Sequence, residues 1–230
     1  MVRLSQERDA MCSLTVLELA CPCCGGKYPS TVLTTPGTPG LTTTDFFTMT
    51  AGEQAIHHQV HTCPGCGFSF EEVEEGEIRE DVRRFVQEAI TPKLPKGEIP
   101  SWKKFEFLAL IDEHLGAGFY SVAMLYLHAA WCCYDLKEKE LEKLYRTMAI
   151  EYFIMESGSA SRDQDLIYLV PYLIGEQYRR IGQKEEAVRW YDIVMEMEQD
   201  HPDSGFFMTL AAQQKISPKE YMGEIIHEEP

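Results

Sequence analysis

The sequence CPCCGGKY, residues 21–28, places three cysteines within four residues and follows them with two glycines. A second stretch, CPGCGFSF at residues 63–70, repeats its form: cysteine, proline, any residue, cysteine, glycine. In each stretch proline favours a tight turn, and glycine can take the positive φ that follows the second cysteine. Two such knuckles supply four thiolates, the tetrahedral set of a closed structural zinc site. We therefore expect one structural Zn²⁺, bound by Cys21, Cys24, Cys63 and Cys66.

The third thiol of the first knuckle, Cys23, lies at the variable position, where we expect its side chain to point away from the metal. A redox-active pair of Cys21 and Cys24 is a second interpretation, but it needs the first sulfur at a helix N-terminus. The residues that follow, GGKYPS, do not begin a helix. Disulfides are a third interpretation, and they belong to exported proteins. The pattern favours structural zinc over both.

Three histidines, His57, His58 and His61, come just before the second knuckle. Histidines beside cysteines can form a catalytic zinc site that keeps one position open for water. Because four cysteines already fill the predicted site, we expect these histidines to be surface residues of a short strand.

Alternating apolar and polar residues predict strands at 14–20, 28–35 and 55–63, and a short strand after the second knuckle. These strands form two hairpins, each with a CxxC motif at its tip. The stretch TPGTPGLTTT, residues 35–44, is expected to be loop because of its prolines and glycines.

From residue 78 onward the apolar spacing changes to three and four, which is typical of helices. An amphipathic helix over 77–90 is followed by the proline-rich stretch 91–100. We expect Pro171 to kink the fourth of the helices after this stretch, because proline removes a backbone hydrogen bond. The six expected helices cover 102–116, 119–136, 138–157, 163–181, 184–200 and 205–215.

The stretch LIGEQYRRIGQKEEAVRWYDIVMEM, residues 173–197, resembles a tetratricopeptide repeat. Small residues at the family's offsets let two helices approach, and aromatic residues fill the seam between them. A weaker copy covers part of 107–130, so we expect an irregular array and not a long solenoid. The residues that carry the stronger likeness are Ile174, Gly175, Tyr178, Gly182, Ala187, Tyr191 and Val194.

The predicted fold is therefore α+β: a small β-rich, zinc-ribbon-like module followed by an all-α, tetratricopeptide-like helical array. The predicted divisions are the module at 1–76, a helix and proline-rich linker at 77–100, the helical domain at 101–216, and a tail at 217–230 whose last residues, 223–230, are expected to be loose.

Composition limits the functional classes. The 230 residues carry 37 acidic and 21 basic side chains, for a formal net charge of −16, which disfavours binding to nucleic acid. No apolar stretch approaches the 18 residues of a membrane span, and residues 1–20 do not resemble an export signal. We therefore expect a cytoplasmic protein whose eight cysteines are free or metal-bound.

The two knuckles about 40 residues apart, TDFF at residues 44–47, VHTCPGCGFS at 60–69 and the helices that follow resemble a bacterial family known as domain-of-unknown-function family 2225. The resemblance covers most of the chain. It implies a zinc-bearing N-terminal module joined to a tetratricopeptide-like region, and it implies no particular activity.

Both modules are binding architectures, and the sequence shows no nucleophile–base pair and no phosphate loop. We therefore expect no enzymatic activity, and we expect a scaffold whose helical groove binds a protein or peptide partner. The acidic balance favours a basic partner. One alternative is a zinc- or thiol-dependent enzyme, either a hydrolase that uses the three histidines or a redox protein that uses Cys23. Another is a nucleic-acid-binding zinc ribbon. The oligomeric state is not indicated by the sequence.

Overall fold

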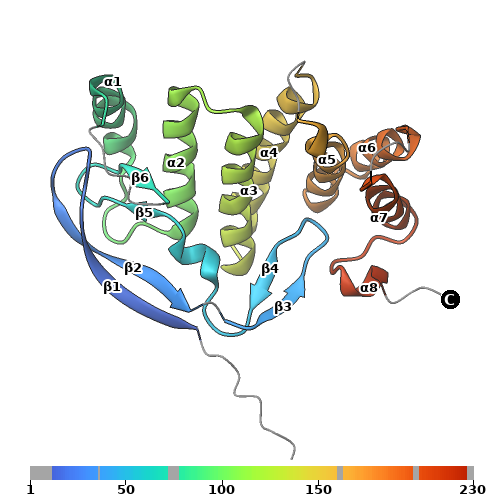
Figure 1. Cartoon of the computed structure of the whole chain (residues 1–230), viewed down its shortest axis with the longest axis horizontal. Helices are drawn as coiled ribbons and strands as arrows, with labels where there is room; N and C mark the ends of the chain where they lie inside the picture. Colours follow the sequence, from blue (N-terminus) through green and yellow to red (C-terminus); the bar gives the residue numbers. More distant parts are fainter. Residues whose placement is uncertain (1–11, 36, 72–77, 160–162, 199–201, 227–230) are drawn as a thin grey trace, which may run out of the picture.

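The computed structural model describes residues 12–35, 37–71, 78–159, 163–198 and 202–226. The fold is α+β, as predicted: short antiparallel hairpins come first, and a row of helices follows (Figure 1). The predicted domain boundaries stay a prediction.

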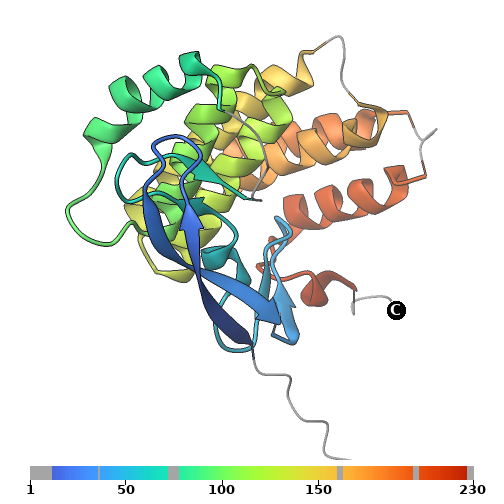
Figure 2. The same ribbon diagram turned by 60° about the vertical axis from the view of Figure 1, so that its left-hand side comes forward.

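Two hairpins carry the knuckles, as predicted. In each, the CxxC motif lies in the turn between the strands, so the strands fix where the sulfurs lie. The long ribbon formed by the first pair crosses in front of the helices in Figure 2. The paired strands are β1 (Ser13–Ala20) with β2 (Lys27–Thr35), and β5 (His61–Thr62) with β6 (Ser69–Phe70).

A third hairpin forms where a loop was predicted, so that prediction is wrong. Strand β3 (Pro39–Thr42) pairs with β4 (Thr48–Thr50). Pro39 is the first residue of its strand, a position at which proline is tolerated.

The predicted strand over 55–63 is also wrong in its first half. Residues Ala55–His58 form the 3₁₀ turn η1, and strand pairing begins only at His61. Ile56 and Val60 are both buried in the main apolar cluster of the helices. His57 therefore lies on a turn and not on a strand.

The helices follow one another side by side, and neighbours from α2 to α7 pack in pairs (Figure 1). Helix α1 continues into a π-helical turn, η2, and a short 3₁₀ turn, η3. Their bounds are α1 (Glu80–Phe85), η2 (Val86–Ile90), η3 (Thr91–Lys93), α2 (Ser101–Leu115), α3 (Phe119–Asp135), α4 (Lys139–Ser157), α5 (Leu169–Arg180), α6 (Lys184–Glu196), α7 (Ser204–Ile216) and α8 (Gly223–Ile226).

Helix α5 begins six residues later than predicted and is not interrupted by Pro171. This proline lies in the first turn, where the N–H groups have no partner within the helix, so it does not need to kink the helix. Within α5, a Cβ on Gly175 would lie 2.6 Å from the ring of Tyr191 on α6. Helices α5 and α6 can therefore lie this close together because residue 175 has no side chain. Their tetratricopeptide-like character stays a prediction.

Residues 43–47, which contain the TDFF sequence, insert against helices α3, α4 and α5. Phe47 stacks on Trp131 of α3, and the Tyr172 hydroxyl of α5 donates a hydrogen bond to the backbone carbonyl of Thr44. The Asp45 side chain is fully buried and contacts Arg146 of α4 at 2.7 Å. We call residues 43–47 the plug. The plug therefore covers one face of α3, α4 and α5, which we call the inner face of the helices.

The predicted tail at 217–230 contacts the plug in its first part, and its residues Gly223–Ile226, which were expected to be loose, form helix α8. The Thr44 N–H donates to the Glu220 carbonyl, and the Met222 N–H donates to the Thr42 carbonyl. Residues 220–222 thus pair with the backbone of residues 42–44 and help to position the plug. Residues 227–230 lie outside the described residues.

Candidate metal centre

The two knuckles have the same backbone geometry, as their matched sequences predict. In the first, the Gly25 N–H donates to the Cys21 carbonyl at 2.8 Å; in the second, the Gly67 N–H donates to the Cys63 carbonyl at the same distance. Both glycines have positive φ, +75° and +82°. Each turn therefore presents its two cysteine side chains in the same way.

The knuckles bring the four predicted cysteines together. Their Sγ atoms all lie within 4.8 Å of one another. Two contacts cross between the knuckles at 3.6 Å, Cys21 to Cys66 and Cys24 to Cys63. A tetrahedron with Zn–S bonds of about 2.3 Å has sulfur–sulfur edges of about 3.8 Å. The spacing of the sulfurs therefore suits a tetrahedral ion. The role of these cysteines as ligands stays a prediction.

The thiols influence one another strongly. Hydrogen bonding with Cys66 lowers the pKa of Cys21 to about 5, and the same interaction raises the pKa of Cys66 well above its usual value. Burial raises the pKa of Cys63 to about 11. Four sulfurs this close cannot all ionise unless a cation neutralises them, so metal binding would displace protons.

Helix α1 and the turns after it form one wall of the centre. The Thr91 hydroxyl donates to the Cys66 carbonyl at 2.7 Å, and Arg83 donates to the Cys23 carbonyl. Val86 and Ile90 are completely buried in the same apolar cluster as the knuckles. The stretch predicted to be a helix and linker therefore also supports the second knuckle.

Cys23 is buried beside the cluster but is not one of the four clustered thiols. Burial raises its pKa, which makes it a poor nucleophile.

None of the three histidines belongs to the four-sulfur cluster among the described residues. His61 bonds to the Ser30 hydroxyl at 2.8 Å, and His58 bonds to Glu53 at 3.1 Å. His57 lies between Ser101 and Asp135. The expectation that the histidines are surface residues fails for His61, which is buried.

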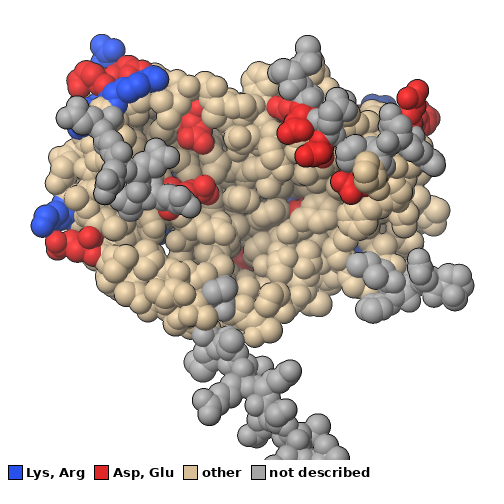
Figure 3. Space-filling model, in the orientation of Figure 1, with Lys and Arg blue, Asp and Glu red and all other residues tan. Residues whose placement is uncertain are grey.

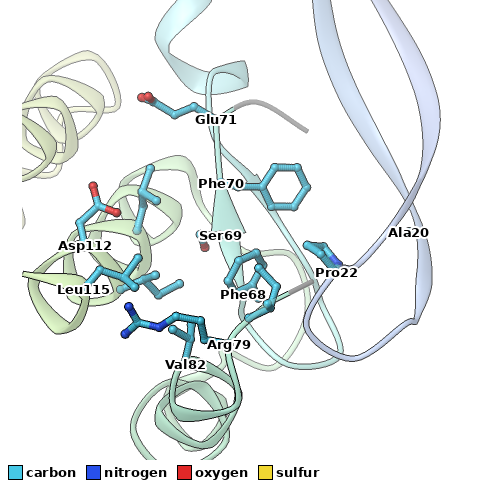
Figure 4. A pocket seen from close by; sticks show the side chains of 13 residues that line it. Ala20, Pro22, Phe68, Ser69, Phe70, Glu71, Arg79, Val82, Asp112 and Leu115 are labelled. Carbon is cyan, nitrogen blue, oxygen red and sulfur yellow. The ribbon is translucent and has the colours of Figure 1, made fainter. Parts of the chain in front are cut away.

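A groove of about 600 Å³ runs beside the first knuckle, between β6, α1 and α2 (Figure 4). Phe68 and Phe70 come from one side, Val82 from α1, and Leu115 from α2. Asp112 also faces this groove, and sequence reasoning did not identify it. We call this hollow the knuckle groove.

Charge is unevenly distributed on the face shown in Figure 3. Acidic side chains gather toward its upper rim, and much of the lower part carries neither acidic nor basic side chains. No described helix is long and apolar enough to cross a membrane.

The fold and the clustered thiols define an α+β protein in which two cysteine knuckles form a candidate metal centre beside a row of helices. The chain belongs to the bacterial family described as "Uncharacterized protein conserved in bacteria (DUF2225)", whose pattern matches residues 14–215. The family predicted from the sequence is thus confirmed. Comparison with curated proteins and with solved structures finds no match.

Proposed function

We propose that the protein is an interaction scaffold whose N-terminal module is organised by one structural zinc ion. The donor set supports this, because four thiolates saturate a tetrahedral site and leave no position open for substrate. The loop between the knuckles carries the plug, so the metal also closes the loop that fills the inner face of the helices.

The partner site that we propose is the knuckle groove and not the inner face of the helices. The sequence suggested a helical groove, but the plug occupies the inner face of α3, α4 and α5. The knuckle groove is also bounded by helices, and its lining is largely apolar: Phe68, Phe70, Ile78, Val82, Ile111 and Leu115.

Asp112 indicates the chemistry of the partner. Its carboxylate is partly buried in the groove, and burial raises its pKa. No described group donates a hydrogen bond to this carboxylate or forms an ion pair with it. A basic side chain would neutralise this charge, while apolar neighbours would fill the groove. We therefore propose that the partner is a protein segment with a Lys or Arg among apolar residues.

The two alternatives from the sequence have less support. For a metal-dependent hydrolase, the described histidines do not join the four sulfurs. A nucleic-acid ligand would meet a chain of net charge −16.

Affinity capture from native extract at low salt tests the groove. The Leu115→Glu and Asp112→Lys variants should each lose the proteins that the wild-type chain retains. Ile193 on α6 is the matched control, because its side chain is 44% exposed and that of Leu115 is 46% exposed. Ile193→Glu should retain the same proteins. Equal capture by all variants, or no specific capture by the wild type, would contradict this proposal.

A further inference from the structure

A second cavity, of about 560 Å³, lies next to Pro64 of the second knuckle. It is bounded by strand β2, by the loop 97–100 and by the first turn of α2. Ser101 and Lys104 of α2 line it, together with His57 and His58 of η1. We call this space the serine cavity.

Three side chains at this cavity form a continuous hydrogen-bond chain. The Ser101 Oγ lies 2.7 Å from His57 Nδ1, and His57 Nε2 lies 2.9 Å from Asp135 Oδ2. Ser101 is the first residue of α2, and Asp135 is the last residue of α3. The three residues are far apart in the sequence, and the fold alone brings them together.

The chain of bonds defines which ring nitrogen carries the proton. An ionised carboxylate only accepts hydrogen bonds, so Asp135 holds the proton on His57 Nε2. The lone pair of Nδ1 then faces the Ser101 hydroxyl, which donates to it. This is the relation of nucleophile, base and orienting carboxylate found in serine hydrolases, with the two ring nitrogens exchanged.

The N-terminus of α2 provides donors next to this hydroxyl. No described group accepts a hydrogen bond from the backbone N–H of Ser101 or Trp102. Both N–H groups lie at the positive end of a 15-residue helix. Such donors can stabilise the oxyanion that forms when a hydroxyl attacks a carbonyl.

Lys104 adds a positive charge to the same cavity. It lies one turn after Ser101 on α2, and its ammonium group has no hydrogen bond or ion pair with any described residue. Burial lowers the pKa of its ammonium group, and nearby Glu98 offsets this effect in part. An acidic group on a ligand would give the ammonium the partner that it lacks.

We propose that the serine cavity hydrolyses a small carboxylic ester that carries an acidic group, which pairs with Lys104. Ser101 Oγ attacks the acyl carbon while its proton passes to His57 Nδ1. The ester C–O bond then breaks, and the same proton passes to the leaving alcohol. Water attacks the acyl-serine, gives one proton to His57, and releases the carboxylic acid as Ser101 regains its proton.

In this scheme Ser101 and His57 are catalytic residues, and Asp135 is a positioning residue. The proposal revises the sequence-based expectation that the protein has no enzymatic activity. It does not depend on the proposed partner site, because the knuckle groove is lined by other residues.

The chain contains its own control for a purely structural serine–histidine contact. Ser30 also lines the cavity and also bonds a histidine, His61, at 2.8 Å. No described carboxylate bonds the second nitrogen of His61, so this pair lacks the third member of the chain.

The test uses the full chain purified with zinc, a fluorophosphonate probe, and the 4-nitrophenyl esters of acetate and succinate. The probe should label Ser101, and Ser101→Ala should lose labelling and at least about 100-fold of the esterase rate. Ser30→Ala should keep both. Asp135→Asn should lower kcat with KM unchanged, and Lys104→Met should lose the preference for the succinate ester. A thermal melt of each variant checks that it is folded.

Absence of labelling and of ester hydrolysis in the folded wild-type chain would overturn the proposal. Labelling or hydrolysis that persists in Ser101→Ala would overturn it as well. In either case the chain from Ser101 to Asp135 would be a structural link between η1, α2 and α3. Partner capture at the knuckle groove would be unaffected by these results, so the two proposals can fail separately.

Discussion

Replacing Asp45 with alanine should weaken the packing of the plug against helices α3, α4 and α5 and lower the free energy of unfolding. The Asp45 side chain has no exposed surface, and Arg146 and Arg180 are 1% and 5% exposed. Its Oδ2 accepts from Arg146 at 2.7 Å and from the Trp131 indole at 2.9 Å, and its Oδ1 lies 3.0 Å from Arg180. The Asp45→Ala variant would leave two buried guanidinium groups without this partner. Breaking a buried ion pair in this way costs about 3–5 kcal/mol.

The size of this effect is large relative to the whole stability of a domain, which is about 5–15 kcal/mol. Urea unfolding followed by circular dichroism measures it as a shift in midpoint. Glu18→Ala is the matched control, because the ion pair of Glu18 with Lys27 is about 70% exposed on both sides. Loss of such a pair changes the free energy of unfolding by at most about 1 kcal/mol.

The stability that Asp45 contributes should fall as the pH is lowered. Burial by itself would raise the pKa of Asp45, but Arg180 and Arg146 hold it well below its usual value. A carboxyl with a lowered pKa in the folded state contributes stability above its unfolded pKa, about 3.9, and loses it as the pH falls below that value. The difference between wild type and Asp45→Ala should therefore be full at pH 7 and shrink in acid. A difference below about 1 kcal/mol at pH 7 would refute the role assigned to this carboxylate.

Three further substitutions test other parts of the fold. In a chelator competition, Gly67→Ala should weaken zinc binding more than Gly25→Ala. Both glycines have positive φ, so alanine is strained at either position. Of the two, only Gly67 would also place its new Cβ 2.7 Å from a neighbouring side chain. Equal losses would contradict this. Gly175→Ala should lower the free energy of unfolding by about 1–3 kcal/mol in urea, because its Cβ would overlap Tyr191. An unchanged midpoint would show that the helices can separate without cost. Burial raises the pKa of Asp112, so the ionised carboxylate destabilises the folded protein. The Asp112→Asn variant should therefore have a higher melting temperature than the wild type at pH 7. In acid, where Asp112 is protonated in both states, the two melting temperatures should be equal. Equal melting temperatures at pH 7 would contradict this.

The local features were predictable because short-range chemistry decides them. The spacing of Cys21 and Cys24, repeated by Cys63 and Cys66, needs only a turn of known geometry, and the hairpins follow from the strands on each side. The periods of three and four likewise gave the helices from α2 to α7 within a few residues, except for the start of α5.

The features that were missed depend on contacts between distant parts of the chain. Strand β3 forms because it pairs with β4 and with the tail at Met222, which outweighs the low strand propensity of its proline and glycine. The insertion of Asp45 between α4 and α5 could not be read from TDFF, because no local pattern shows which helices it will meet. An unexplained acidic residue between hydroxyl and aromatic residues was the only available signal.

The serine cavity was missed for the same reason, because it depends on contacts between distant parts of the chain. Ser101, His57 and Asp135 belong to no motif at fixed spacing, so only the packing of η1 against α2 and α3 brings them together. The predicted helix at 102–116 located the N-terminus of α2 to within one residue, but it did not indicate what Ser101 would face.

Native mass spectrometry of the fully reduced chain tests the central claim most directly, which is that one ion joins the two knuckles. We expect one zinc per chain in the wild type, and loss of that zinc in the Cys66→Ala variant together with broader, more highly charged ions from an opened N-terminal module. A wild-type chain that carries no metal and still shows the narrow charge distribution of a folded protein would contradict the account.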